Sequence, residues 1–210
     1  MIYSRYIYPL KERDQNGRKT ILIQLKRMDP DTFTSADAFK VSSLVYAVMM
    51  EDEESQIAGF NFIVDCADVT LRSMSLFSMT DLKNFVDSLK NSSVGRFKSF
   101  YILNLPTFAI YLFDIAKSTL TDKLRNRIVL PKDIDELKQH IDPSILPKEF
   151  GGGDVTEVEM VELFGLEILK HQPQLEQLNE MSIDLNILSK TSGKTSVEGT
   201  VGSFRKLDID

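Results

Sequence analysis

FYILNLPTFAIYLFDIAKSTL, residues 100–120, is the stretch of sequence that decides the fold. Its beginning is rich in β-branched and aromatic residues, which predicts a strand over 100–104. From Pro106 onward almost every residue is apolar, and Asp114 is the only charged residue before Lys117. A helix without a polar face is buried, lies on a membrane or covers an apolar molecule, and this one is too short to span a bilayer. The stretch therefore predicts a strand that leads into a helical lid.

Strand and helix patterns alternate on both sides of this stretch. The predicted strands cover 20–25, 59–65 and 127–130, and the predicted helices begin near 34 and 80 and cover 133–140 and 158–169. Strands separated by helical segments of ten or more residues favour right-handed crossovers and a mainly parallel sheet. The sequence thus predicts an α/β fold.

Composition and charge restrict the class of protein. The chain has 210 residues, of which 42% are hydrophobic and 27% charged, as expected for one substantial globular domain. A net charge of −6 argues against a general nucleic-acid binder, because neutralising phosphates needs a broad basic surface. The single cysteine, Cys66, excludes an internal disulfide and a cysteine-built metal site. With no signal-peptide pattern at the start of the sequence, we expect a cytoplasmic protein.

The sequence contains no recognisable catalytic or metal-binding motif. His140 and His171 are its only histidines, and neither has a second ligand at metal-binding spacing. Gly151-Gly-Gly153 lacks the Lys-Ser/Thr that follows a phosphate-binding loop, so we interpret it as a turn. We therefore expect no catalytic residues, no metal and no cofactor.

Several motifs in order resemble a known family. They are NLP (104–106), LTDKLRNRI (120–128) and ILPKEFGG (145–152), supported upstream by DQNGRK (14–19), DPDTF (29–33) and GFNFIVD (59–65). Together they resemble the CRAL-TRIO lipid-binding domains, and within them the α-tocopherol-transfer and retinaldehyde-binding branch. The resemblance covers roughly residues 10 to 170.

The resemblance implies a sheet floor, flanking helices and a mobile apolar gate helix over a cavity for one hydrophobic molecule. By matching position, the gate falls on residues 106–120. The implied ligand-binding residues are Phe39, Ser42, Ser43, Tyr46, Phe60, Phe62, Val64, Phe85, Leu89, Phe100 and Ile102, with Phe108 and Leu112 on the gate. Arg96, Lys123 and Arg127 match the basic residues that hold a phosphoinositide head group in tocopherol-transfer relatives.

The resemblance also implies the domain organisation and the partners. Residues 1–170 would form the lipid-binding domain without the helical segment that precedes it in the family, and 171–210 a C-terminal extension. Composition predicts disorder from about 191. We expect a monomer that binds a hydrophobic small molecule or lipid, contacts phosphoinositide-containing membranes transiently and binds no nucleic acid. Two alternatives stay open: an interaction module that transfers no ligand and, less favoured, an enzyme that acts on a lipid.

Overall fold

The computed structural model describes residues 5–78, 80–81, 83–85, 87 and 95–180. Two compact units divide the chain, Met1–Gln172 and Pro173–Asp210, and the sheet lies in the first. Its strands are β1 (Ile7–Arg13), β2 (Lys19–Gln24), β3 (Phe60–Asp65), β4 (Phe97–Leu103) and β5 (Ile128–Val129). Leu89, a predicted ligand-binding residue, and the tail from 191 lie outside the described residues.

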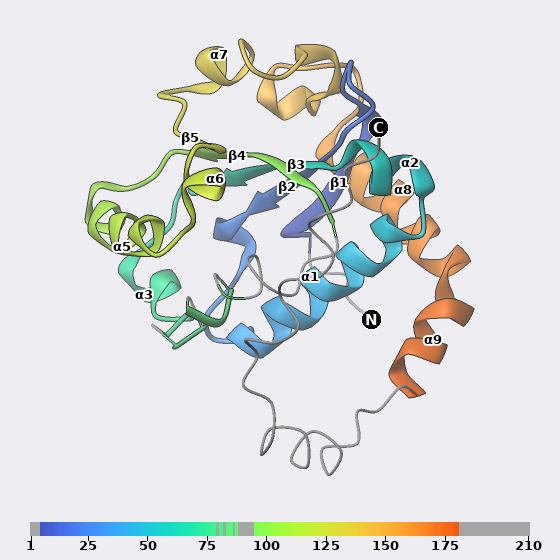
Figure 1. The fold of residues 1–210 in the computed structure, drawn as a ribbon, viewed down its shortest axis with the longest axis horizontal. Helices are drawn as coiled ribbons and strands as arrows, with labels where there is room; N and C mark the ends of the chain where they lie inside the picture. The colour runs from blue at the N-terminus through green and yellow to red at the C-terminus, as the bar shows by residue number, and fades with distance from the viewer. Residues whose placement is uncertain (1–4, 79, 82, 86, 88–94, 181–210) are drawn as a thin grey trace, which may run out of the picture. The chain divides into compact units, whose positions relative to one another are not determined.

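Helices connect and flank these strands. They are α1 (Ser35–Met50), α2 (Glu53–Ala58), α3 (Leu71–Met74), α5 (Thr107–Ser118), α6 (Asp122–Arg125), α7 (Ile134–Leu137) and α8 (Glu157–Lys170), with α9 (Gln172–Glu180) almost wholly in the second unit. Short 3-10 turns occupy η1 (Leu25–Arg27), η2 (Pro143–Ile145) and η3 (Lys148–Phe150). Figure 1 shows the strands in the middle, with α5 to their left and α8 to their right. None of the described helices combines the length and apolarity that crossing a bilayer requires.

The five strands form one sheet in sequence order, β1 to β5. β2, β3, β4 and β5 run parallel to one another, whereas β1 pairs with β2 in the antiparallel direction. The α/β class with a mainly parallel sheet is therefore confirmed. β1 was not predicted from the sequence. It carries Pro9 and ends in Lys11-Glu-Arg13, a pattern that an edge strand tolerates better than a central one.

The two faces of the sheet are buried to different extents. Leu22, Ile63 and Leu103 share one face and are each 0% exposed. Against this face packs α8, whose buried side chains are Glu157, Met160, Phe164 and Ile168. On the opposite face, Phe62 and Phe100 are only half-buried. One face is thus sealed by the chain itself, and the other leaves part of its apolar surface open.

Polar bonds attach the sealed face to the start of α8. Thr156 and Glu159 form a capping box there, and the buried Glu157 carboxylate accepts a 2.8 Å hydrogen bond from Gln24 Nε2 and another from Arg27. Burial, and secondarily the negative charge of Glu157, raise the pKa of Tyr8 above its ordinary value. This face therefore holds a fixed polar network and is closed to an apolar guest.

Candidate functional site

The turn between β4 and α5 sets the position of the predicted lid. Asn104 adopts a left-handed conformation, with φ 54°, that asparagine tolerates better than most residues. Its Nδ2 donates a 2.8 Å hydrogen bond to Asp65 Oδ1, which lies at the end of the neighbouring strand. Pro106 then stands in extended conformation as the N-cap, and its carbonyl accepts a 2.8 Å bond from Ala109 N. The helix predicted over 106–120 therefore forms as α5 and begins from a fixed corner.

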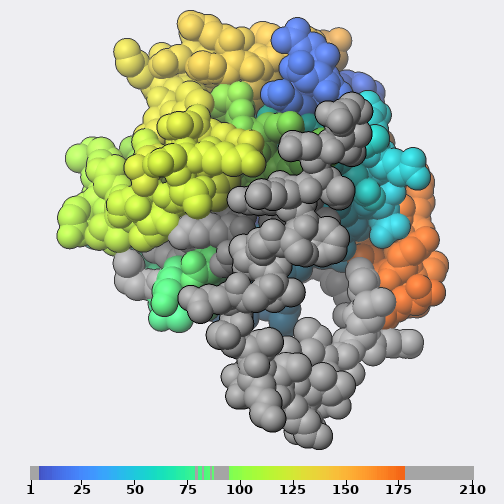
Figure 2. Space-filling view, viewed as in Figure 1, coloured from blue at the N-terminus to red at the C-terminus, as the bar shows by residue number. Residues whose placement is uncertain are grey.

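The side chains of α5 confirm its unusual pattern. Ala109 is its only buried residue, whereas Phe108 and Ile110 are partly exposed and Tyr111 is 73% exposed. In Figure 2, the lime to yellow residues, from α5 to β5, form one continuous surface on the left of this face. A surface helix normally places charge where α5 places these apolar groups. Its outer face is consequently suited to an apolar medium.

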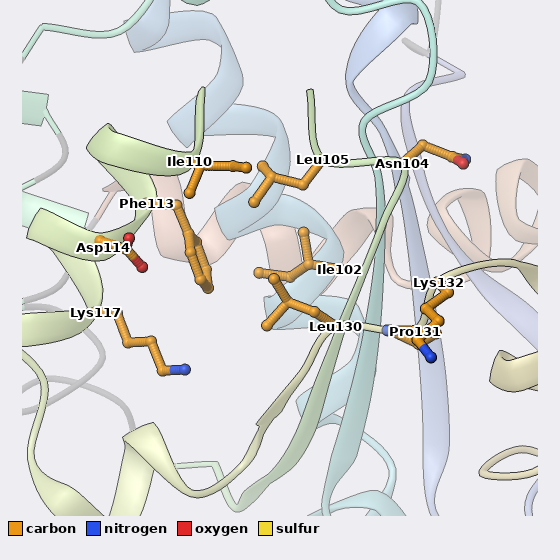
Figure 3. A pocket seen from close by; sticks show the side chains of 10 residues that line it. All are labelled: Ile102, Asn104, Leu105, Ile110, Phe113, Asp114, Lys117, Leu130, Pro131 and Lys132. Atoms are coloured by element: carbon orange, nitrogen blue, oxygen red, sulfur yellow. The ribbon is translucent and has the colours of Figure 1, made fainter. Parts of the chain in front are cut away.

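A pocket of about 340 Å³ lies between α5 and the end of β4. Figure 3 shows Ile110 and Phe113 of α5 facing Ile102 and Leu130 across it. The remaining lining residues are Asn104, Leu105, Asp114, Lys117, Pro131 and Lys132. Of the ligand-binding residues implied by the resemblance, only Ile102 belongs to this lining. The pocket occupies the carboxyl end of parallel strands, where ligands of α/β sheets commonly bind.

Most of the implied aromatic residues meet on the half-buried face. The rings of Phe62 and Phe100 stack with centroids 5.0 Å apart, and Tyr46 lies 5.8 Å from Phe60. Phe97, which the sequence reasoning missed, joins them at 5.4 Å from Phe62 and 6.0 Å from Tyr46. These five residues form the aromatic cluster. The cluster lies on the face of the sheet that was predicted to form the floor of the cavity. Its rings contact one another closely.

Phe97 was missed because the strand was predicted to begin at residue 100, and an irregularity in strand pairing also conceals its place. Strict alternation would put Phe97 and Phe100 on opposite faces, since they are an odd number of residues apart. A register shift between Phe60 and Asn61 in the β3–β4 pairing brings both onto one face. No sequence signal that we recognise marks this shift.

The remaining ligand-binding residues implied by the resemblance lie in several different environments. Val64 and Ile102 are register partners on the half-buried face, and Leu112 is half-buried on α5. Phe39 packs edge-on against Phe77, with ring centroids 6.5 Å apart. Ser43, Phe85 and Phe108 are exposed.

The hydroxyl of Ser42 is engaged with another side chain. Tyr6 donates its phenolic proton to Ala38 O at 2.7 Å, so the 3.1 Å contact between Tyr6 and Ser42 has Ser42 as its donor. Burial raises the pKa of Tyr6 to about 12, although the bond with Ser42 opposes this. Ser42 can therefore only accept a hydrogen bond from a ligand unless it releases Tyr6.

Two of the three implied phosphoinositide-binding residues already bond to the backbone. Arg127 donates to Phe97 O and Arg96 to Ile57 O at 3.2 Å. Both lie at the amino-terminal end of β4, whereas Lys123 is an exposed residue of α6. Lys98, two residues after Arg96, adds a half-buried cation whose stem lies next to Gly59.

Within the described part of the chain, no group of three or more histidine, cysteine or acidic residues could hold a metal ion. Cys66 is buried, and burial, reinforced by the charge of Asp65, raises the pKa of its thiol to about 12. The thiolate is the nucleophilic form of cysteine, and burial disfavours that form here.

Comparison with known proteins identifies the family. A model of the CRAL/TRIO domain matches residues 3–152. This chain belongs to the CRAL/TRIO domain family. The narrower assignment to the tocopherol-transfer and retinaldehyde-binding branch stays a prediction.

Clavesins are among the relatives of this CRAL/TRIO domain. Clavesin-1 of Xenopus laevis is 33% identical over 144 residues, which cover 68% of this chain and 43% of that protein. Clavesin-2 of Homo sapiens is 31% identical over 144 residues, covering 68% of this chain and 44% of that protein. The matched region thus spans less than half the length of these relatives. A solved structure titled "Crystal structure of Sfh5" aligns with 71% of this chain and 56% of its own, at a TM-score of 0.48 and 16% identity.

Proposed function

We propose that this CRAL/TRIO domain binds one hydrophobic molecule, such as a tocopherol-, retinoid- or carotenoid-like lipid, and transfers it between membranes inside the cell. The observation that carries the proposal is α5, an apolar helix that exposes Phe108 and Tyr111 and lines a pocket with Ile110 and Phe113. We propose no catalytic role. The polar groups described above hold the fold together and offer no activated nucleophile.

The proposed transfer cycle uses the membrane to open the lid. In water, moving α5 away from the sheet exposes further apolar surface, which is unfavourable. At a bilayer the same surface is buried among acyl chains, so the membrane binds the open state better than the closed one. Because the membrane binds the open state better, it shifts the equilibrium between the closed and open states toward the open one. Contact of a phosphoinositide head group with Arg96, Lys123 and Arg127, joined by Lys98, would hold the domain at the membrane during exchange.

The lid is tested by measuring transfer of a fluorescent tocopherol between vesicles. We expect Tyr111→Ser to slow transfer about five- to tenfold, because the variant loses roughly 1 kcal/mol of apolar burial in the membrane. Leu166→Ser is the control, since Leu166 is 58% exposed on α8 and belongs to neither α5 nor the proposed head-group site. Equal rates for the two variants would refute the lid role.

The head-group contact needs a separate comparison. Lys123→Ala combined with Arg127→Ala should slow transfer to vesicles that contain a phosphoinositide and leave transfer to neutral vesicles almost unchanged, because each cation near an anionic surface contributes roughly 1 kcal/mol. Arg127 also bonds to Phe97 O, so the thermal midpoint of the variant must be measured alongside. A single Lys123→Ala variant, at an exposed position, supplies the same comparison without that bond. Unchanged transfer to both vesicle types contradicts the contact.

The aromatic cluster favours a second candidate function, an interaction module that carries no ligand. The close contact of Phe62 with both Phe97 and Phe100 fills part of the proposed cavity floor. Mass spectrometry of the purified protein under native conditions distinguishes the two. A carrier retains a lipid of defined mass, whereas a module with a filled cavity shows the mass of the chain alone.

A further inference from the structure

Two sequence motifs that the proposed function does not use meet near the amino-terminal ends of β2 and β3. They are DQNGRK (14–19) and GFNFIVD (59–65). Asn61 Nδ2 donates a 3.0 Å hydrogen bond to Asp14 Oδ2. The other carboxylate oxygen of Asp14 accepts bonds of 2.8 Å and 2.9 Å from the backbone N–H groups of Asn16 and Arg18. Asp14 therefore fixes both the turn between β1 and β2 and the side chain of Asn61.

The carboxylate of Asp14 determines the orientation of the Asn61 amide. A carboxylate oxygen accepts hydrogen bonds, so the amide nitrogen of Asn61 faces it and the amide oxygen is turned away. Asn61 is only 3% exposed, and no group among the described residues donates a hydrogen bond to its Oδ1. This oxygen is thus a buried acceptor whose donor the described chain does not supply.

Thr20 places a hydroxyl group next to this acceptor. Thr20 and Asn61 are register partners in the parallel pairing of β2 with β3, so their side chains leave the sealed face of the sheet from strands about 4.8 Å apart. Thr20 is 0% exposed, and within the described part of the chain its Oγ1 has no hydrogen-bond partner either. A hydroxyl can donate a hydrogen bond, whereas Asn61 Oδ1 can only accept one. The two atoms are complementary, yet they do not bond to each other.

Buried polar atoms that lack a protein partner are commonly satisfied by an internal water molecule. We infer that one water molecule is bound between Thr20 Oγ1 and Asn61 Oδ1. It accepts the hydroxyl proton of Thr20 and donates one of its own protons to Asn61 Oδ1. Two such hydrogen bonds in series span at most about 5.5 Å, a reach that suits side chains on neighbouring strands. A metal cation is disfavoured, because these two side chains are uncharged and offer only one oxygen each.

The bound water would extend one chain of hydrogen bonds from the turn between β1 and β2 through β3 and back to β2. Asp14 holds the turn and the Asn61 amide, and the water joins that amide to Thr20. This chain gives the residues Asp14 and Asn61 of the two motifs a shared physical role. The site does not involve α5, so the inference is independent of the proposed function.

A high-resolution crystal structure of the full chain tests the inference. We expect electron density for one water molecule between about 2.6 and 3.2 Å from both Thr20 Oγ1 and Asn61 Oδ1. Thr20→Val keeps nearly the same shape and removes the hydroxyl, so this density should be lost and the urea midpoint should fall. Ser99→Ala is the control, because Ser99 is the register partner of Asn61 on β4 and is half-buried. The control variant should keep the density.

A second measurement does not depend on crystals or on the folding of a variant. In the unchanged protein in solution, nuclear Overhauser effects should connect the Thr20 methyl protons with a water molecule, and their absence overturns the inference. A direct hydrogen bond from Thr20 to Asn61 Oδ1, without water density, also overturns it. Water density that stays unchanged in Thr20→Val contradicts the assigned role of the hydroxyl.

Discussion

Single residues at the corners of this domain determine where its site can form. Asn104 is the clearest case, because its left-handed backbone and its bond to Asp65 both act at the junction of β4 and α5. Neither property is visible as a pattern in the sequence, where Asn104 is simply the last residue of the strand predicted over 100–104. The same residue nevertheless directs the first turn of α5 toward the sheet.

Substitution of Asn104 therefore tests how much its left-handed backbone and its hydrogen bond contribute to stability. Asn104→Gly keeps the backbone conformation and loses the hydrogen bond, so it should lower the free energy of unfolding by about 1 kcal/mol. Asn104→Ala loses both and should cost about 2 kcal/mol or more. Urea denaturation followed by circular dichroism measures the difference. An alanine variant as stable as the glycine variant would show that the left-handed conformation carries no cost.

Two helices of the fold begin where local sequence signals predict them. Thr34 and Asp37 form a capping box at the start of α1, and Thr156 and Glu159 form another at the start of α8. Such signals depend on residues within one turn, which is why the helix starting near 34 and the amphipathic helix over 158–169 were predictable. The register of β4 against β3 depends on two distant segments, and its irregularity was not predictable.

The capping boxes predict a specific dependence of stability on pH. Hydrogen bonds from Thr34 lower the pKa of Asp37, and those from Thr156 lower the pKa of Glu159. A carboxylate whose pKa is lower in the folded state stabilises the fold fully above its unfolded value, about 4, and loses that effect as pH falls through the folded value. The variant Asp37→Asn with Glu159→Gln should thus have a lower urea midpoint at pH 6.

This difference between the variant and the unchanged protein should shrink as the pH falls below about 4 and through the lowered pKa values of the two native carboxylates, which then become protonated. Glu162→Gln is the control, since Glu162 is an exposed residue of the same helix, α8, outside its capping box. It should leave the midpoint unchanged at both pH values. A difference that stays constant down to pH 2.5 would contradict a role of the ionised carboxylates.

At the scale of the whole molecule, all the buried apolar side chains that the structure describes lie within the first unit. The last of them along the chain is Ile168, in α8, and the first unit ends at Gln172. Met160, Phe164 and Ile168 are the buried apolar side chains of α8, which packs against β1. The stability of the sheet is therefore expected to depend on α8 and to be independent of the second unit.

Shortening the chain from its C-terminal end tests whether the stability of the sheet depends on α8 and not on the second unit. A chain that ends after Gln172 should keep its urea midpoint within the equivalent of about 0.5 kcal/mol, because it loses none of the described core side chains. A chain that ends before α8 should fail to fold, because it uncovers β1, where Tyr8 and Leu10 are buried, and removes the bonds to Glu157. Loss of cooperative unfolding in the longer chain would mean that residues 173–210 contribute to the core.

The sequence by itself determined the α/β class, the apolar helix that follows its third predicted strand and the motifs that indicate the family. These properties depend on the periodicity of apolar residues and on spacings within short segments, and both can be read directly from the sequence. Tertiary structure decided that Phe97 joins the aromatic cluster, that one face of the sheet is sealed while the other is half open, and that Lys117 and Lys132 border the same pocket. The physical reason is that strand register and the packing of distant segments depend on contacts between residues far apart in the chain, whose relative positions exist only once the sheet has formed.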